Sequence, residues 1–327
     1  MELNESEVLL RVRAIFDQRA DSAELKVGNG DDAAVFQSAS QIVVGTDMAV
    51  EDVHFKFGWS SPIEVGRKIT AANLADVCAM GGWPKFLLVS VAFPKHYLGV
   101  LEELATGIHL EAGKVGAKVI GGDLSSAEKL VVSITAIGET NKAIRRSGAQ
   151  IGDLVMISHL PGWSAAGLEI LRDWNSQLRD NPSALVKRAL QQHRAPEIDY
   201  QSYRNAFNFI SAATDISDGL LVDAAHVSQA SGVAININSN SLQETDEFAL
   251  LEQLCRQIPN QETSHSAAID WVYSSGEEHV LLATGAEPIE GMLIIGKVEE
   301  GIGLLIDGNV VEASQLVDGK SGFQHLW

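Results

Sequence analysis

The feature that most constrains this chain is a recurring pattern in which an apolar strand is followed by an aspartate. Three segments show it: residues 41–47, 118–123 and 211–215. They end in Thr46 and Asp47, in Asp123 after two glycines, and in Asp215. Strands that each deliver a carboxylate at their carboxyl end are expected to bring these groups together. The pattern therefore predicts one acidic site that binds metal ions.

Helices and strands alternate in the first half of the chain, judged by the spacing of apolar residues. The expected elements are helices at 62–80 and 98–115 and strands at 86–93, 117–120 and 130–138. Before them, a short polar turn joins the segment 27–36 to residues 41–47, which predicts a hairpin. This succession of elements predicts an α/β (α+β) fold.

A polar, charged segment near residues 139–153 divides the sequence. With 327 residues, the chain is long enough for two domains of ~100–200 residues each. We therefore expect an N-terminal domain of residues 1–144 and a C-terminal α/β domain of residues 145–327. Both halves contain a strand, an aspartate and a helix in succession.

The formal net charge of -19 limits the possible partners. A surface this acidic repels phosphates, so we expect no binding to nucleic acid or to anionic lipid. A phosphorylated ligand would need divalent cations to offset the charge. The longest apolar run, residues 86–93, is shorter than the ~20 residues of a membrane-spanning helix. The acidic start of the chain does not resemble a secretory signal, and we expect a cytoplasmic protein.

Seven residues carry side-chain oxygen atoms that suit hard metal ions. Six of them lie next to glycines or at the ends of expected elements, and the seventh, Asp76, lies in an apolar helix three residues after Asn73. They are Asp32, Thr46, Asp47, Asp76, Asp123, Asp215 and Asp218. Mg²⁺ takes one or two carboxylates, keeps several waters and completes its shell with substrate phosphates. For any one of these aspartates, ordinary turn chemistry is the alternative. The recurrence of the pattern favours Mg²⁺.

The segment 215–219 stands directly before an expected helix. Ser217 and the amides of the first turn could hold a phosphate there, at the positive end of the helix dipole. The alternative is an ordinary helix cap by Ser217 or Asp218.

Two other segments could contact a nucleotide. Gly122 would let the backbone approach the nucleotide while Asp123 holds metal, although a plain tight turn explains the same residues. Arg146 could bind a phosphate with its guanidinium, or could lie in a solvated linker. The chain has no Walker or Rossmann glycine motif, so any nucleotide site is of another kind.

Six segments together resemble the thiamine-monophosphate kinase family in order and spacing. They are 30–35 (GDDAAV), 46–55 (TDMAVEDVHF), 72–81 (ANLADVCAMG), 121–123 (GGD), 146–153 (RSGAQIGD) and 215–220 (DISDGL). The wider superfamily includes aminoimidazole-ribonucleotide synthetase, selenophosphate synthetase and the hydrogenase-maturation dehydratase. The chain lacks the nucleophilic cysteine that selenophosphate synthetases usually carry near the N-terminus. It also lacks the terminal cysteine of the hydrogenase-maturation enzyme.

The resemblance implies two α/β domains and a homodimer in which the mixed N-terminal sheets join into a β-barrel. It implies ATP and several Mg²⁺ ions, with the seven oxygen-bearing residues above as metal ligands. It also assigns contacts to ATP and to thiamine monophosphate. The ATP contacts are Gly122, Asp123, Arg146 and Ser217, and the substrate contacts are His54, Glu277 and Phe323.

The chain departs from the family pattern in two places. Gly45 stands where the family has a serine, and residues 274–281 read SSGEEHVL where the family has SGGEDYEL. The implied reaction is direct in-line transfer of the γ-phosphoryl group of ATP to thiamine monophosphate, with no catalytic base. The alternatives are another ATP-dependent enzyme of the superfamily and a non-catalytic protein that binds a nucleotide or thiamine phosphate.

Overall fold

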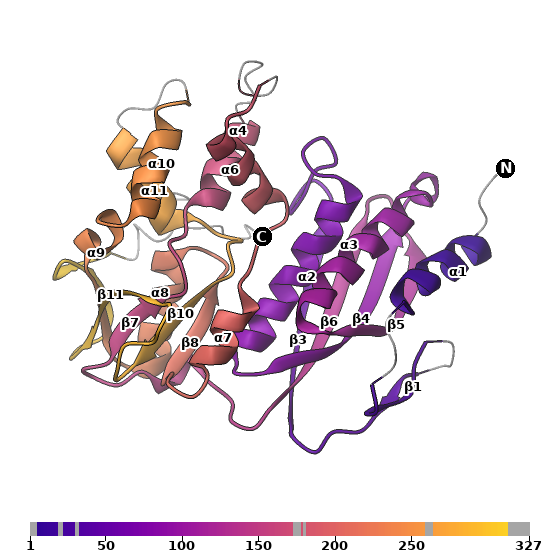
Figure 1. Cartoon of the computed structure of the whole chain (residues 1–327), viewed down its shortest axis with the longest axis horizontal. Helices are drawn as coiled ribbons and strands as arrows, with labels where there is room; N and C mark the ends of the chain where they lie inside the picture. Colours follow the sequence, from indigo (N-terminus) through magenta and orange to yellow (C-terminus); the bar gives the residue numbers. More distant parts are fainter. Residues whose placement is uncertain are drawn as a thin grey trace. The chain divides into compact units, whose positions relative to one another are not determined.

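The computed structural model describes residues 5–18, 22–29, 33–172, 178, 181–258 and 264–312. The chain divides into two compact units, Met1–Ala143 and Ile144–Trp327 (Figure 1). Both units combine helices with β-sheet, so the predicted mixed α/β architecture is confirmed. No described helix is long and apolar enough to span a bilayer.

The N-terminal unit is built on a four-stranded mixed sheet of order β3-β6-β4-β5. The strands β4 and β5 are parallel, and the other neighbours are antiparallel. A separate two-stranded sheet joins β1 and β2. The elements are α1 (Glu5–Phe16), β1 (Leu25–Val27), β2 (Val35–Phe36), β3 (Gln41–Val50), α2 (Pro62–Ala79), β4 (Trp83–Phe93), the 3₁₀ turn η1 (Lys95–Tyr97), α3 (Val100–Val115), β5 (Lys118–Ser126) and β6 (Val131–Thr140).

The predicted hairpin between residues 27–36 and 41–47 is wrong. In the structure β2 pairs with β1, and β3 pairs along its whole length with β6. The pairing of β3 depends on a strand about 90 residues further along the chain, which local turn signals do not report.

Two of the predicted strands continue past their aspartates instead of ending at them. Asp47 lies inside β3, and Asp123 lies inside β5. Gly122 allows β5 to continue, because a Cβ atom there would lie 1.9 Å from the carbonyl oxygen of Val89 on the neighbouring strand. Gly122 therefore serves close strand pairing, and the two glycines do not form a turn.

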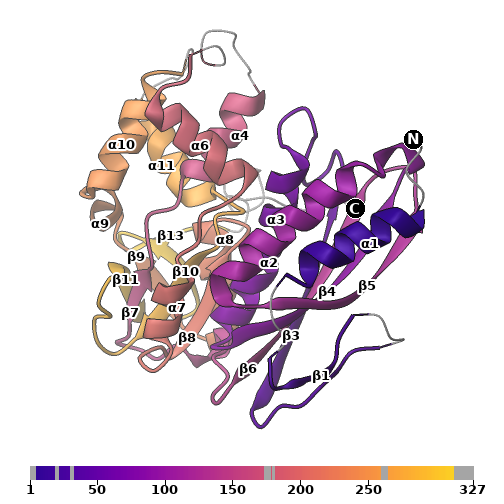
Figure 2. The ribbon, with the colours of Figure 1, turned by 45° about the vertical axis from the view of Figure 1, so that its right-hand side comes forward.

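The helices α2 and α3 pack against each other on one face of this sheet (Figure 2). Ser61 and Glu64 form a capping box that starts α2. The two helices approach closely through glycines: a Cβ on Gly66 would lie 2.3 Å from the Leu104 carbonyl oxygen, and one on Gly107 would lie 2.1 Å from that of Ile63. Any larger residue at either position would push the helices apart.

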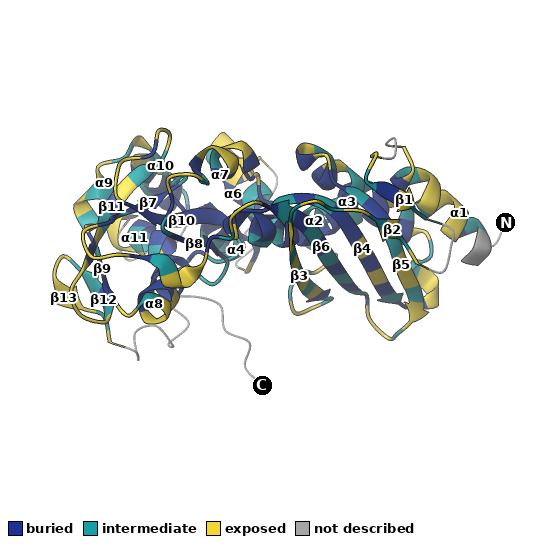
Figure 3. Ribbon diagram, turned by 90° about the horizontal axis from the view of Figure 1, so that it is seen from below, coloured by how far each residue is buried: buried dark blue, intermediate teal, exposed yellow. Residues whose placement is uncertain are grey.

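The two faces of the sheet differ in exposure, and buried and exposed residues alternate along its strands (Figure 3). Ile134 and Val89 lie on the face covered by the helices and are buried. On the opposite face, Val44 is 61% exposed and Met48 is 56% exposed. An open sheet face with large apolar side chains is unusual for a surface that meets only water.

The C-terminal unit contains a seven-stranded sheet of order β13-β12-β9-β11-β7-β10-β8, in which only β9 and β12 are parallel neighbours. Its helix α8 packs on β8, and α4 packs on α6. The elements are the 3₁₀ turn η2 (Arg146–Gly148), β7 (Leu154–Ile157), α4 (Trp163–Arg172), α6 (Ala184–Arg194), α7 (Tyr200–Ala206), β8 (Ala212–Ile216), α8 (Leu220–Ser231), β9 (Ala234–Ile237), α9 (Ser239–Gln243), α10 (Asp246–Cys255), α11 (Ser264–Ser274), β10 (Val280–Gly285), β11 (Leu293–Glu299), β12 (Gly303–Ile306) and β13 (Asn309–Val310).

Candidate active site

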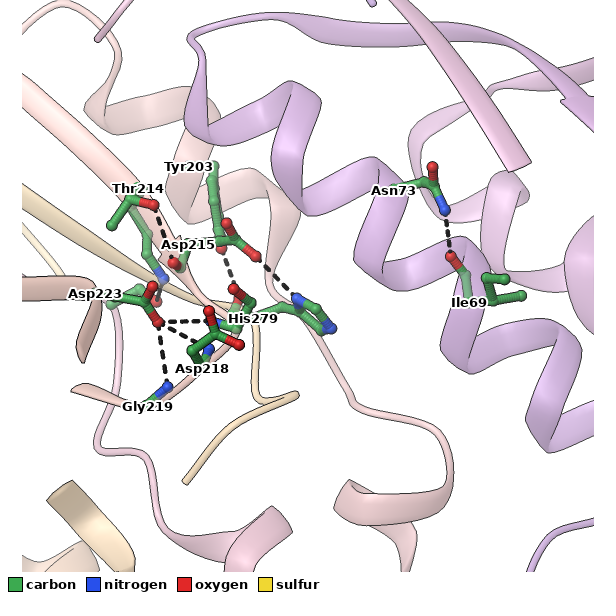
Figure 4. Close-up of polar contacts among 12 residues, drawn as sticks. Ile69, Asn73, Tyr203, Thr214, Asp215, Asp218, Gly219, Asp223 and His279 are labelled. Carbon is green, nitrogen blue, oxygen red and sulfur yellow. Dashed lines mark hydrogen bonds and ion pairs between the residues drawn. The ribbon is translucent and has the colours of Figure 1, made fainter. Parts of the chain in front are cut away.

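In the N-terminal unit, Asp47 lies on the face of the sheet that α2 covers, and Asp76 lies on the side of α2 that contacts β3. The backbone N–H of Asp47 donates to Oδ1 of Asn73 at 3.1 Å. The side-chain nitrogen of Asn73 donates to the Ile69 carbonyl at 2.9 Å (Figure 4). A Cβ on Gly45 would lie 3.9 Å from the Cβ of Asp76. Since Gly45 and Asp47 are two residues apart on one strand, both face α2.

Thr46 and Asp123 lie on the other face of the sheet. The Thr46 hydroxyl donates to the Ile134 carbonyl at 3.0 Å, so it is engaged within the sheet. Asp123 aligns with Ser90, which aligns with Ser133 and then with Met48. Asp123 therefore faces away from Asp47. Three strand spacings separate β5 from β3, about 14 Å. Within one chain the sheet does not bring these two aspartates together.

His54 lies in the turn that follows β3. Its Nδ1 accepts the N–H of Val50 at 3.1 Å, so a neutral ring carries its proton on Nε2. Nearby, the Tyr97 hydroxyl donates to Glu51 at 2.7 Å, and this bond to a carboxylate raises the pKa of Tyr97. The rings of Phe57 and Tyr97 meet edge to face at 5.3 Å. This end of the sheet thus combines aromatic rings with a carboxylate and an imidazole.

In the C-terminal unit, β8 carries Asp215 in a buried position, 2% exposed. Its Oδ2 lies 2.9 Å from Nδ1 of His279 (Figure 4). The preceding residue, Thr214, accepts a hydrogen bond from Nε of Arg146 at 3.1 Å. Arg146 begins the turn η2, which contacts β8. The structure therefore brings Arg146 beside the segment that carries Asp215.

The turn between β8 and α8 is held by Asp223, a residue that the sequence analysis missed. One oxygen of this buried carboxylate accepts the backbone N–H groups of Ser217, Asp218 and Gly219 at 3.0, 3.0 and 3.2 Å (Figure 4). Gly219, with a φ of 124°, is the N-cap residue. The alternative of a helix cap by Ser217 or Asp218 is wrong, because Gly219 is the N-cap residue and the Asp223 carboxylate reaches back from inside α8. An aspartate at the fourth position of an apolar helix was the available signal.

The segment around Glu277 lies directly on this turn. The N–H of Glu277 donates to the Ser217 carbonyl at 2.8 Å, and a Cβ on Gly276 would lie 2.7 Å from the same oxygen. An oxygen of Glu277 lies 3.9 Å from Nδ1 of His193. The predicted substrate contact Glu277 and the predicted nucleotide contact Ser217 are therefore neighbours.

Glu278 has a different role from Glu277, because it is completely buried. Its carboxylate accepts the N–H groups of Gly162 and Ser164 at 2.9 and 2.6 Å, at the start of α4. The Ser275 hydroxyl and the Gln192 side chain donate to it as well, at 2.8 and 3.1 Å. These four bonds satisfy the buried charge and fix the segment 275–279 against α4.

The candidate ligands suit a Mg²⁺ ion that is bound by one or two carboxylates and whose remaining ligands are not protein side chains. In the described parts of the chain, no group of three or more His, Cys, Asp or Glu side chains is arranged to hold a metal ion. Mg²⁺ needs only one or two carboxylates when phosphates and water complete its shell. The described carboxylates that could serve in this way are Asp47 on β3, Asp76 on α2, Asp215 on β8 and Asp218 in the turn after it. Asp32 and Phe323 lie outside the described residues.

The chain also matches known proteins over most of its length. The family model for AIR synthase related protein, N-terminal domain, matches residues 30–140. Thiamine-monophosphate kinase of Aquifex aeolicus is 33% identical over 303 residues, which cover 91% of this chain and 94% of the relative. Its counterpart in Mycobacterium tuberculosis is 35% identical over 302 residues, 89% of this chain and 84% of the relative.

Solved structures give the same result. The structure of AaThiL complexed with AMPPCP and TMP superimposes with a TM-score of 0.77 at 29% identity, covering 100% of this chain and 99% of that one. A match of this extent includes both units of the fold. The chain therefore belongs to the thiamine-monophosphate kinase family.

Proposed function

We propose that this protein transfers the γ-phosphoryl group of ATP to thiamine monophosphate, giving thiamine diphosphate and ADP, in a reaction that depends on Mg²⁺. The observation that carries the proposal is the hydrogen bond from the Glu277 N–H to the Ser217 carbonyl at 2.8 Å. It joins the segment predicted to bind the phosphate acceptor to the turn predicted to bind ATP. Relatives named thiamine-monophosphate kinase, aligned over about nine-tenths of the chain, support the same assignment.

The acceptor explains which side chains the site needs. The phosphate of a monoester is already ionised and nucleophilic at neutral pH, so no residue has to remove a proton from it. The difficulty is to bring two anions into line in a protein whose own net charge is -19. Bound Mg²⁺ supplies neutralisation and positioning of both phosphates. Its proposed ligands are Asp32, Thr46, Asp47, Asp76, Asp123, Asp215 and Asp218.

The other predicted contacts complete the proposal. Arg146 and Ser217 bind the ATP phosphates, and Gly122 with Asp123 binds ATP at the edge strand β5. His54, Glu277 and Phe323 bind thiamine monophosphate. In this scheme the N-terminal domain of residues 1–144 binds ATP and Mg²⁺, and residues 145–327 complete the substrate site. The cytoplasmic location and the absence of nucleic-acid and membrane partners remain predictions from the sequence.

A homodimer is part of the proposal, with the two N-terminal sheets joined into a barrel. Two observations support it. The open face of the sheet exposes Val44 and Met48 on β3, an edge strand with unpaired backbone groups. In addition, one chain holds Asp47 and Asp123 at opposite edges of the sheet. A second copy could bring a β5 edge close to β3. Light scattering of the purified protein should give twice the 35.1 kDa chain mass.

A turnover assay tests the proposed reaction. The purified chain with thiamine monophosphate, ATP and Mg²⁺ should form thiamine diphosphate, detected by chromatography. Asp47→Asn should reduce kcat at least about a hundredfold, because it removes charge where the phosphates meet. Asp52→Asn, in an exposed ion pair with Lys129, is the matched control and should keep full activity.

Three outcomes would contradict the proposal. Near-normal turnover of Asp47→Asn at saturating Mg²⁺ would remove the metal assignment. A phosphoenzyme trapped from labelled ATP would exclude direct transfer. Binding of both substrates by the wild-type protein without product would indicate a non-catalytic binding protein.

A further inference from the structure

The segment 274–281, in which this chain departs from the family pattern, has an unusual backbone. Glu277 and His279 have left-handed φ angles of 57° and 53°. Residues other than glycine rarely adopt this backbone conformation, and it persists only where surrounding contacts impose it. The contacts of His279 therefore hold this residue in a conformation that it would otherwise rarely adopt.

The backbone of His279 is anchored on both sides. Its N–H donates to the Ile216 carbonyl at 2.9 Å, and its carbonyl accepts the hydroxyl of the buried Tyr203 at 2.6 Å (Figure 4). The preceding residue, Glu278, accepts two hydrogen bonds from the start of α4 and two more from the side chains of Gln192 and Ser275. The imidazole of His279 is thus presented from a rigid backbone.

The imidazole holds one oxygen of Asp215. Nδ1 of His279 lies 2.9 Å from Oδ2 of Asp215, and the two residues are 5% and 2% exposed. An ionised carboxylate can only accept, so Nδ1 is the donor. Among the described residues, no hydrogen bond reaches Oδ1 of Asp215. One oxygen is held by the protein, and the other is left for a ligand.

We propose that His279 is a positioning residue that restricts Asp215 to a single ligand oxygen and thereby makes the cation site favour Mg²⁺ over Ca²⁺. The inference rests on the proposed function, in which Asp215 binds Mg²⁺. Mg²⁺ requires near-ideal octahedral geometry, whereas Ca²⁺ accepts both oxygens of one carboxylate. A carboxylate with one oxygen held by a fixed imidazole suits the first ion better than the second.

The test compares His279→Ala with His279→Asn in the full chain. The Asn side chain can place a donor where Nδ1 lies, and Asn tolerates left-handed φ angles. Calorimetry measures the dissociation constant of the ATP analogue AMPPCP with Mg²⁺ and with Ca²⁺. His279→Ala should weaken Mg²⁺-dependent binding about tenfold, which is the size of effect typical for residues that orient metal ligands. Binding with Ca²⁺ should change little, and His279→Asn should stay near the wild type.

Tyr203→Phe provides a second variant in case His279→Ala does not fold. It frees the His279 carbonyl without altering the imidazole, so the ratio of Mg²⁺ to Ca²⁺ affinity should fall in the same direction by a smaller factor. An unchanged ratio in a folded His279→Ala overturns the inference, as does an unchanged ratio in Tyr203→Phe if His279→Ala is unfolded. A wild-type protein that binds Mg²⁺ and AMPPCP but makes no thiamine diphosphate overturns the proposed function alone.

Discussion

The two units present their aspartates in different ways. In the N-terminal unit, Asp47 and Asp76 lie on a strand and a helix, and one amide side chain, Asn73, links the two elements. In the C-terminal unit, Asp215 lies near the end of β8 and Asp218 lies in the irregular turn that follows, which the buried side chain of Asp223 holds. Regular elements satisfy their own backbone groups, whereas a buried turn needs dedicated partners. The C-terminal site should therefore be the more sensitive to single substitutions.

Among the substitutions that test this contrast between the units, Asp223→Ala should have the largest effect on stability. Removal of this carboxylate leaves three N–H groups without their acceptor, that of Gly219 buried and those of Ser217 and Asp218 half-buried, so unfolding should become easier by about 3 kcal/mol. Turnover should fall more than tenfold as Ser217 and Asp218 lose their positions. Urea denaturation and steady-state kinetics measure the two effects. Asp223→Asn is the matched control, since its side-chain oxygen can still accept. Equal losses in both variants would contradict a positioning role.

A smaller effect is expected for Asn73→Ala in the N-terminal unit. The change removes one acceptor for the Asp47 N–H and one donor to Ile69, and should cost about 1–2 kcal/mol of stability. The KM for ATP should rise severalfold because Asp47 is less well held. Asn73→Asp keeps the acceptor but buries a carboxylate against the Ile69 carbonyl oxygen, so it should lose at least as much stability. If Asn73→Ala proved more damaging than Asp223→Ala, the contrast between the units would be wrong.

Gly45→Ser, which restores the residue usual in the family, should have little effect. A Cβ at this position would meet the Cβ of Asp76 at 3.9 Å, an ordinary contact distance. Stability should change by less than about 0.5 kcal/mol. The dependence of turnover on Mg²⁺ concentration is the sharper measurement, because the added hydroxyl would lie beside the Asp47 and Asp76 pair. A large loss of stability would mean that β3 and α2 lie closer than described.

The smallest effect concerns His226, whose Nδ1 lies 3.6 Å from Asp223. The neighbouring Asp223 carboxylate raises the pKa of His226. A raised pKa in the folded state adds stability that is complete below the unfolded pKa, near about 6.5, and is lost as pH rises through the folded value. His226→Gln should flatten the urea midpoint between about pH 6 and 8. Because the imidazole is 45% exposed, the change should be slight. If His226→Gln had the same pH profile of stability as the wild type, the interaction of His226 with Asp223 would not contribute to stability.

Some differences between sequence and structure concern strand pairing. Alternating apolar residues located most strands and the helices at 62–80 and 98–115 to within a few residues. They could not show that β3 pairs with β6 instead of with residues 27–36, because that choice depends on contacts about 90 residues apart. Nor could they show that Asp47 and Asp123 face opposite sides of one sheet.

The supporting residues were harder to find than the proposed ligands. Asp223 stands outside the six segments that match the family, and His279 stands in a segment that departs from the family pattern. Each is defined by what it contacts in space. The segment 274–281 looked divergent as a sequence, yet its unusual residues make specific contacts: Glu278 at the start of α4 and His279 on Asp215. A residue that positions a metal ligand can be replaced by another residue type when the residues around it also change. A sequence motif therefore does not identify it.

By itself the sequence determined the kinds of element, the acidic residues available to bind cations and the family to which the chain belongs. These follow from local periodicity and from residues close together along the chain. Only the tertiary structure decided which face each aspartate takes and which side chains hold the turn at 215–219. Strand order and burial arise from contacts between distant residues, and no short stretch of sequence contains them.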